Sequence, residues 1–165
     1  MWISERGLLY IGECVAGDRA ATEEEIAAYE LGKARDSKLA AIEAAFDAHV
    51  LAGMPYSEKV LQIRDEDRAT ITAVFSRAMA YVGQETAPLP EGVTITWPEG
   101  GHPWRMLDDT YVLLSPSAFI DMAQRAADFY GALFYISRAM KDAATAASSA
   151  EDLVAIDVTA GWPAA

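Results

Sequence analysis

The sequence has 165 residues, 52% of them hydrophobic, and a formal net charge of −12 at pH 7. This length and apolar content suit one globular domain, or one domain with a small appendage, that needs no disulfide to stabilise its core. The negative charge repels nucleic-acid phosphates and anionic lipid, so we expect neither nucleic acid nor a membrane as a partner. The single cysteine, Cys14, excludes an internal disulfide and a cysteine-based zinc site. No apolar run approaches the ~20 residues of a membrane span, and the first residues lack the pattern of a signal peptide.

Residues 1–21 are predicted to form a small strand or hairpin segment. Apolar and aromatic side chains dominate residues 1–16, and breaks at Glu5-Arg6-Gly7 and at Gly12 separate them into short strands. A hairpin of this size is only marginally stable alone, so it must pack on something. Its apolar residues form a candidate partner surface: Trp2, Leu8, Leu9, Tyr10 and Ile11. The alternative is that these side chains simply cover a helix of the same chain.

Residues 22–54 are predicted to form one long helix. Thr22 and the acidic residues that follow it form a capping box, and Gly53 ends the periodic pattern. Gly32-Lys33 interrupts the pattern, so a weak or bent point is expected there. The segment could link two parts of the chain or oligomerise, because four apolar positions fit a short heptad run: Leu39, Ile42, Phe46 and Val50.

Residues 55–165 are predicted to form a carboxy-terminal α+β domain. Its expected strands are residues 59–64, 93–97, 104–107 and 111–114. A helix capped by Asp65 should end at Gly83, and the prolines and glycines between residues 85 and 101 exclude a helix there. Asp108-Asp109 suits a tight turn between the last two strands.

The longest helix is expected at residues 115–147, and the rest of the chain should be organised around it. Ser115 can cap the helix and Pro116 fits its first position. Apolar residues from Phe119 to Met140 form a stripe wide enough to need more than one neighbour. Ser148 with Glu151 predicts a second capping box, for a short helix through Ile156. The chain is therefore predicted to be a mostly helical α+β protein, with two or three long amphipathic helices packed with short antiparallel hairpins.

Catalytic and metal-binding patterns are weak in this sequence. His102 with Asp108 and Asp109 could supply a general base and an orienting carboxylate, but a loop and a turn explain these residues equally well. His49 lacks companion ligands, and Cys14 is expected to be a small buried apolar group. We therefore predict no catalytic residue, no metal, no cofactor and no enzyme activity.

A family resemblance is carried by the chain from about Tyr56 to its end. The matching features are Trp104, Asp108-Asp109, Val112 and Leu114-Ser115, then Tyr130, Tyr135 and Arg138-Ala139-Met140-Lys141, then Ser149 to Asp157 and Gly161-Trp162-Pro163. Together they resemble an uncharacterised domain family of phages and prophages, whose members occur among tail-region, tail-fibre and tail-fibre-assembly proteins. Asp109 departs from the asparagine more often expected in that turn, although both residues suit it. The resemblance implies no catalytic residues.

Three functions are consistent with these observations. The resemblance implies first a tail-fibre assembly chaperone or accessory protein that binds a fibre or other tail protein. The second is a structural component of the virion tail that forms a homo-oligomer through residues 22–52. The third is a small hydrolase that uses His102 and the two aspartates. The first two place the protein in the bacterial host cytoplasm during assembly or in the virion tail.

Overall fold

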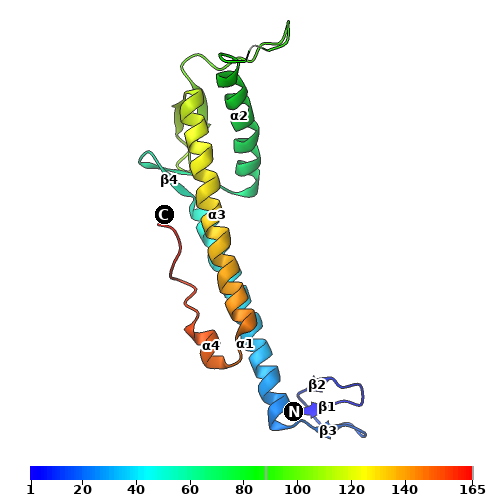
Figure 1. The fold of residues 1–165 in the computed structure, drawn as a ribbon. Helices are drawn as coiled ribbons and strands as arrows, with labels where there is room; N and C mark the ends of the chain where they lie inside the picture. The colour runs from blue at the N-terminus through cyan, green and yellow to red at the C-terminus, as the bar shows by residue number, and fades with distance from the viewer. Residues whose placement is uncertain (88, 165) are drawn as a thin grey trace. The chain divides into compact units, whose positions relative to one another are not determined.

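The computed structural model describes residues 1–87 and 89–164 and confirms the predicted fold class, a mostly helical α+β fold with short antiparallel hairpins (Figure 1). The helices in this part of the chain are α1 (Glu23–Ala52), α2 (Asp65–Gly83), α3 (Pro116–Ala146) and α4 (Ala150–Ala155). The strands are β1 (Trp2–Ile3), β2 (Leu9–Tyr10), β3 (Arg19–Ala20), β4 (Met54–Tyr56), β5 (Lys59–Leu61), β6 (His102–Arg105) and β7 (Tyr111–Leu114).

The chain forms two compact units, each with its own core. The first contains Met1–Ile42 and Met140–Val158, and the second contains Glu43–Ala139 and the residues from Thr159 onward. Helices α1 and α3 therefore each supply residues to both units.

The first unit holds the amino-terminal sheet and a small helical core. The sheet is antiparallel with the strand order β2-β1-β3, so Trp2 lies opposite both Tyr10 and Ala20. The predicted hairpin is confirmed, but β3 was not predicted, because its two residues have too little apolar pattern to indicate a strand. The core consists of four buried residues from α1, α4 and the end of α3: Ile42, Ala144, Ala147 and Leu153.

Two cations of α1 satisfy main-chain carbonyls in this first unit. Arg35 donates from Nε to the carbonyl of Ala144 at 3.2 Å and from Nη2 to that of Ala147 at 2.8 Å. Lys38 donates from Nζ to the carbonyl of Ile156 at 2.9 Å. The last carbonyls of a helix have no partner within it, so these bonds complete the ends of α3 and α4.

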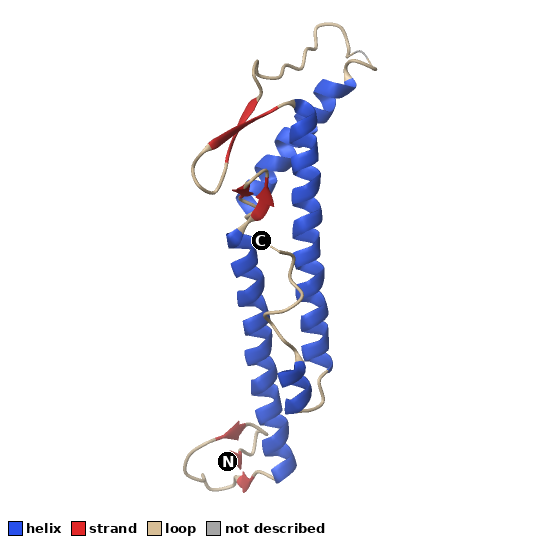
Figure 2. Cartoon of the chain, turned by 90° about the vertical axis from the view of Figure 1, so that its left-hand side faces the viewer, coloured by secondary structure: helices blue, strands red, loops and turns tan. Residues whose placement is uncertain are grey.

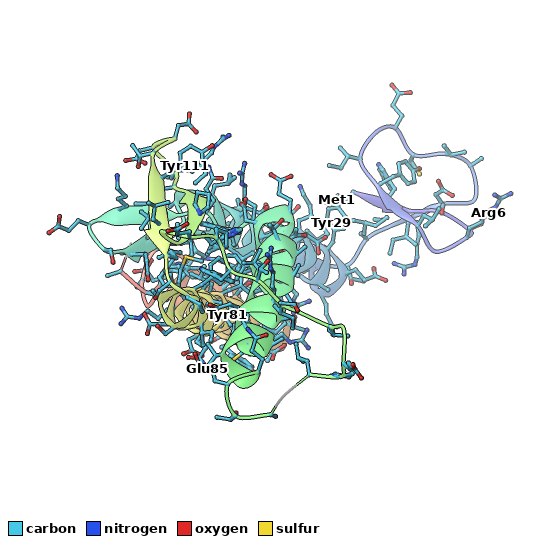
Figure 3. The ribbon with its side chains drawn as sticks, turned by 90° about the horizontal axis from the view of Figure 1, so that it is seen from above. Met1, Arg6, Tyr29, Tyr81, Glu85 and Tyr111 are labelled. Carbon is cyan, nitrogen blue, oxygen red and sulfur yellow. The ribbon has the colours of Figure 1, made fainter. Side chains whose placement is uncertain are left out.

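The second unit packs α2 and the second hairpin against α3. Its fully buried large side chains are Leu61, Ile63, Met106, Phe119, Met122 and Leu133. The hairpin β6–β7 leads directly into α3 (Figure 2). The inner face of this hairpin carries Trp104 and Leu114, whereas Pro103, Arg105, Tyr111 and Leu113 face outward. Figure 3 labels Tyr111 on strand β7 of this hairpin.

Local signals set the ends of the two long helices. The Glu25 N–H donates to Thr22 Oγ1 at 3.2 Å, and the Thr22 N–H donates to Glu25 Oε2 at 2.9 Å, which is the predicted capping box. The Ala118 N–H donates to Ser115 Oγ at 3.2 Å, so Ser115 caps α3 as predicted. Helix α1 continues unbroken through Gly32.

The predicted strand at residues 93–97 is wrong, because this segment pairs with no strand among the residues that the structure describes. Side chains from elsewhere in the second unit bind its carbonyls instead. Gln84 donates to the carbonyl of Ile95 at 3.1 Å, and Arg77 donates to that of Thr96 at 2.6 Å. Trp97 donates from Nε1 to the carbonyl of Leu114 at 3.0 Å. A loop whose polar groups are satisfied in this way needs no sheet.

Several other element boundaries also differ from the prediction, and strand β6 begins at His102 and ends at Arg105 instead of covering the predicted 104–107. Strand β5 is shorter than the predicted 59–64 and pairs with β4, which the sequence did not indicate. Asp65 is the first residue of α2 rather than its cap, and the Arg64 N–H donates to Asp67 Oδ2 at 3.1 Å. The capping box of α4 is displaced by one residue, to Ser149 and Asp152.

The wide apolar stripe of α3 is only partly covered by the chain. Phe119, Met122, Ala126 and Leu133 are buried, as the periodicity predicts. On the neighbouring stripe, however, Ala127 and Phe134 are exposed. The predicted need for several neighbours is therefore not fully met within the described residues.

Candidate functional site

The amino-terminal sheet is ordered by hydrogen bonds rather than by a hydrophobic core. Trp2 Nε1 donates to the carbonyl of Gly12 at 2.9 Å. The Tyr10 hydroxyl donates to Asp18 Oδ2 at 2.5 Å and accepts from the Val15 N–H at 3.2 Å. The bond to the Asp18 carboxylate raises the pKa of Tyr10, because it stabilises the protonated phenol. Strands of two residues thus gain a fixed conformation from bonds across their loops.

Exposed aliphatic side chains lie at the ends of β2 and in the loop that follows it. The exposed fractions are 67% for Leu8, 76% for Ile11 and 62% for Val15. Of the predicted surface residues, Trp2, Leu9 and Tyr10 are instead half-buried. Val15 was not predicted, because it follows the apolar run at the edge of a loop. We define Leu8, Ile11 and Val15 as the amino-terminal apolar surface. Figure 3 shows Arg6 in the loop that joins β1 and β2 of this sheet.

The four predicted helix-pairing positions pack within the chain. Ile42 is fully buried in the first unit, and Leu39 packs against its cluster. In the second unit Phe46 meets the ring of Tyr130 edge-on at 5.8 Å, and Val50 packs on the core. Their apolar surface is therefore used, wholly for Ile42 and in part for the others, by contacts inside each unit.

The structure does not bring His102 and the aspartate pair together. His102 begins strand β6 rather than lying in the predicted loop, and it faces Leu114 across the hairpin. Asp108 and Asp109 occupy the turn at the other end of that hairpin. The rings of Trp97, Trp104 and Phe119 lie 5.4, 6.3 and 5.8 Å from His102. Burial, and next the charge of Arg77, lower the pKa of His102.

Structural contacts account for both aspartates of the turn. Asp108 accepts hydrogen bonds from Thr110 and from Lys59 Nζ, which lower its pKa to about 2. Asp109 adopts a φ of 62° and pairs with Arg105 at 3.0 Å, so it holds the tight turn that the sequence predicts. A base and an orienter would need to be within hydrogen-bond reach, which this hairpin does not provide.

The other reactive residues also lie apart from one another. Cys14 is exposed, so its predicted role as a buried apolar group is wrong; its loop holds it outside the sheet. His49 stacks on Trp162 with ring centroids 4.8 Å apart. Within residues 1–87 and 89–164, no group of three His, Cys, Asp or Glu residues is placed to hold a metal.

A polar cleft of about 450 Å³ lies between α2 and the β6–β7 hairpin. Its charged groups are already paired: Arg64 Nε donates to Asp67 Oδ2 at 2.9 Å, and Arg64 Nη2 donates to Gln62 Oε1 at 2.7 Å. The polar groups of Gln62, Arg64 and Asp67 in this cleft therefore bind one another.

Comparison with known protein families identifies one matching family model. The family model described as a domain of unknown function (DUF4376) matches residues 33–160. No curated protein and no solved structure matches the chain. Among the described residues, no helix combines the length and apolar character that crossing a membrane requires.

Proposed function

The chain belongs to the DUF4376 family, and we propose that it is a phage or prophage tail-associated protein that binds a fibre protein during tail-fibre assembly. The proposed place of action is the bacterial host cytoplasm, where such fibres are assembled. The identity of the partner rests on the resemblance of the segment from Tyr56 to the end. The way in which it binds is argued below from the first unit.

The amino-terminal apolar surface is the observation that supports binding to another protein. Leu8 and Ile11 flank β2, Val15 lies in the loop before β3, and each is more than 60% exposed. Hydrogen bonds of Trp2 and Tyr10 hold these loops against the sheet. Exposed aliphatic side chains that are close in the sequence are candidates for docking a partner. Because the sheet is ordered before binding, a partner that covers these side chains gains apolar burial without the cost of ordering the backbone.

The edges of this sheet offer a second kind of contact. Among the described residues, the strand order β2-β1-β3 leaves β2 and β3 each with one unpaired side, and short exposed edges can accept a further strand. A fibre segment with an extended backbone and apolar side chains would match both features. The surface lies outside residues 33–160, so it is a feature of this chain beyond the part that the family model matches.

A pull-down with matched variants tests this proposal. The tagged chain is recovered from a lysate of the phage- or prophage-bearing host, and captured proteins are identified by mass spectrometry. The test variant carries Leu8→Ser and Ile11→Ser. The control is Val154→Ser in α4, a residue that is 79% exposed in the same unit. We expect wild type and control to recover a fibre protein and the test variant to lose it.

The protein list of purified particles separates the two tail functions. Recovery of a fibre protein with this chain absent from particles would identify an assembly chaperone. Its presence in particles would identify a structural tail component, the alternative role. Recovery of no tail protein, together with absence from particles, would refute both, and an unchanged yield with the double variant would refute the binding surface.

A further inference from the structure

The polar cleft of about 450 Å³ runs along one edge of strand β6. Four consecutive residues of this strand line it, from His102 to Arg105. Neighbouring residues of a strand point to opposite faces of its sheet, so a cavity lined by all four lies at the strand edge rather than on one face. The opposite wall is formed by the segment before α2 and by the start of that helix: Gln62, Arg64, Asp67 and Thr70.

The hydrogen bonds of the β6–β7 hairpin alternate along β6. The Met106 N–H donates to the Thr110 carbonyl across the hairpin at 2.9 Å. In an antiparallel pair, the residues that bond to the partner strand recur at every second position, so Trp104 also bonds to β7. The backbone N–H and carbonyl groups of Arg105, and the carbonyl of Pro103, therefore point to the other side of β6.

That other side is the side of the cleft. The Leu107 N–H, which follows the same alternation as Arg105, donates to the Val60 carbonyl of β5 at 2.9 Å. Beyond this bond the chain after β5 and strand β6 form the two walls of the cleft. Within the described residues, no main-chain group outside the hairpin bonds to the Arg105 N–H or to the carbonyls of Pro103 and Arg105. The pairing that starts between β5 and β6 therefore leaves a strand edge open.

Arg105 also offers a cation to a ligand in the cleft. Its Nε pairs with Asp109 at 3.0 Å, but the two side chains are 58% and 76% exposed, so the pair is weak and the guanidinium stays open to solvent. The charged residues that line the cleft are two cations and one anion, Arg64, Arg105 and Asp67. This local balance is positive in a chain whose net charge is −12, so it favours an acidic ligand.

We propose that the polar cleft binds an extended segment of a partner protein, which adds to β6 as a strand and carries an aspartate or glutamate beside Arg105. Two N–H groups of the segment donate to the carbonyls of Pro103 and Arg105, and one of its carbonyls accepts the Arg105 N–H. Opposite charges on neighbouring strands attract, so the acidic side chain selects the segment while the main-chain bonds hold it. This inference is independent of the tail-fibre proposal, because it concerns another surface in the other unit.

Amide exchange of the free chain tests the open edge without a ligand. Trp104 donates its N–H to β7, whereas the N–H of Arg105 faces the cleft. We expect the Arg105 amide to exchange faster than the Trp104 amide by about tenfold or more, after correction for intrinsic rates. Equal protection of the two amides would overturn the open edge.

Selection from a library of short random peptides on the full chain supplies the probe. We expect the selected peptides to carry Asp or Glu at one position, between residues of high strand propensity. Selection of no binder, or of binders with no acidic preference, would overturn the proposal.

Methylation of single backbone nitrogens in the selected peptide tests strand addition. Successive N–H groups of an extended peptide point to opposite edges, so only every second one can donate to β6. We expect affinity measured by fluorescence anisotropy to alternate along the peptide, with a loss of about tenfold at the donating positions and little change between them. A loss without alternation would overturn the strand geometry.

Two matched threonine variants locate the bound peptide. Thr70 lines the cleft and Thr72 does not, although both are exposed on α2 and donate their hydroxyls to the carbonyl four residues earlier. We expect Thr70→Trp to abolish binding and Thr72→Trp to leave it unchanged. Equal affinities for the two variants would overturn the location. Concentration-dependent dimerisation of the wild type that Thr70→Trp abolishes would overturn the partner and assign the cleft to a second copy of this chain.

The charge contact has its own control. Arg125 is an exposed arginine of the same unit whose Nε pairs with Asp121 at 3.0 Å, as that of Arg105 pairs with Asp109. Replacing the acidic residue of the peptide by its amide should weaken binding roughly two- to fivefold in the wild type and in Arg125→Gln. Arg105→Gln should show no such difference between the two peptides. A difference that persists in Arg105→Gln would overturn the role of Arg105.

Discussion

Arg35 is predicted to hold the carboxy-terminal end of α3 in the first unit, and Arg35→Met tests this role. Methionine keeps an apolar stem of similar length but removes both donors to the carbonyls of Ala144 and Ala147. A hydrogen bond from a charged donor contributes ~1.5–3 kcal/mol. Counting the 2.8 Å bond in full and the 3.2 Å bond by half gives roughly 2–4.5 kcal/mol. Because Arg35 is half-buried and water can replace a lost bond, we expect the low end of this range, about 2 kcal/mol.

Native-state hydrogen exchange provides the assay. We expect the opening free energy of amides in the last turn of α3 and in α4 to fall by about 2 kcal/mol in Arg35→Met. Lys33→Met is the matched control, because Lys33 is an exposed cation of the same helix whose described contact is with the Tyr29 ring at 5.6 Å. In the control, the opening free energy of the same amides should fall by less than about 1 kcal/mol, the most expected for an exposed cation–π contact. Equal losses in the two variants would refute the carbonyl contacts as the cause.

Two further predictions concern the second unit. Leu133 is fully buried, so Leu133→Ala should lower the free energy of unfolding by about 2–5 kcal/mol in urea denaturation. The neighbouring Phe134 is 51% exposed, so Phe134→Ala should lower the same free energy clearly less. A larger effect of Phe134→Ala than of Leu133→Ala would contradict the assigned core. Burial and Arg77 lower the pKa of His102 below its ordinary 6.5, so the unfolded chain takes up a proton first as the pH falls. The free energy of unfolding should therefore decrease as the pH falls from about 6.5 towards the lower pKa of His102 in the folded chain. His102→Phe should lack this pH-dependent decrease. Identical pH dependences of the wild type and His102→Phe would refute the role of His102.

Helix boundaries were predictable where one side chain binds the backbone nearby. The reciprocal bonds of Thr22 and Glu25 join residues three positions apart, and Ser115 caps α3 over the same separation. The Asp108-Asp109 turn was also predictable, since Asp109 tolerates the positive φ that it adopts. Each of these signals is local, so composition and spacing contain most of the information that sets these boundaries and this turn.

Contacts between distant residues were not predictable in this way. The β4–β5 hairpin turns at Ser57 and Glu58, which both have positive φ although neither is a glycine or an asparagine. Its two strands therefore lacked the usual turn signal. Likewise, Arg35 reaches carbonyls more than 100 residues away in the sequence. No periodicity indicates such a partner.

The same difference between local and distant signals applies to the exposed residues. The aliphatic residues of the amino-terminal segment could be identified from composition, but only the fold separates the exposed Leu8 and Ile11 from the half-buried Leu9. The contact of Arg68 with the Tyr130 ring could not be identified from the sequence at all. It joins α2 to α3, so it depends on how the two helices pack.

The location of the amino-terminal apolar surface bears on what the family could share. The family model matches residues 33–160, which include none of the amino-terminal sheet. The surface therefore suits a partner specific to chains that carry this sheet. We infer that transferring residues 1–21 to another family member would transfer fibre binding, and a chimera that recovers no fibre protein in the pull-down would contradict this inference.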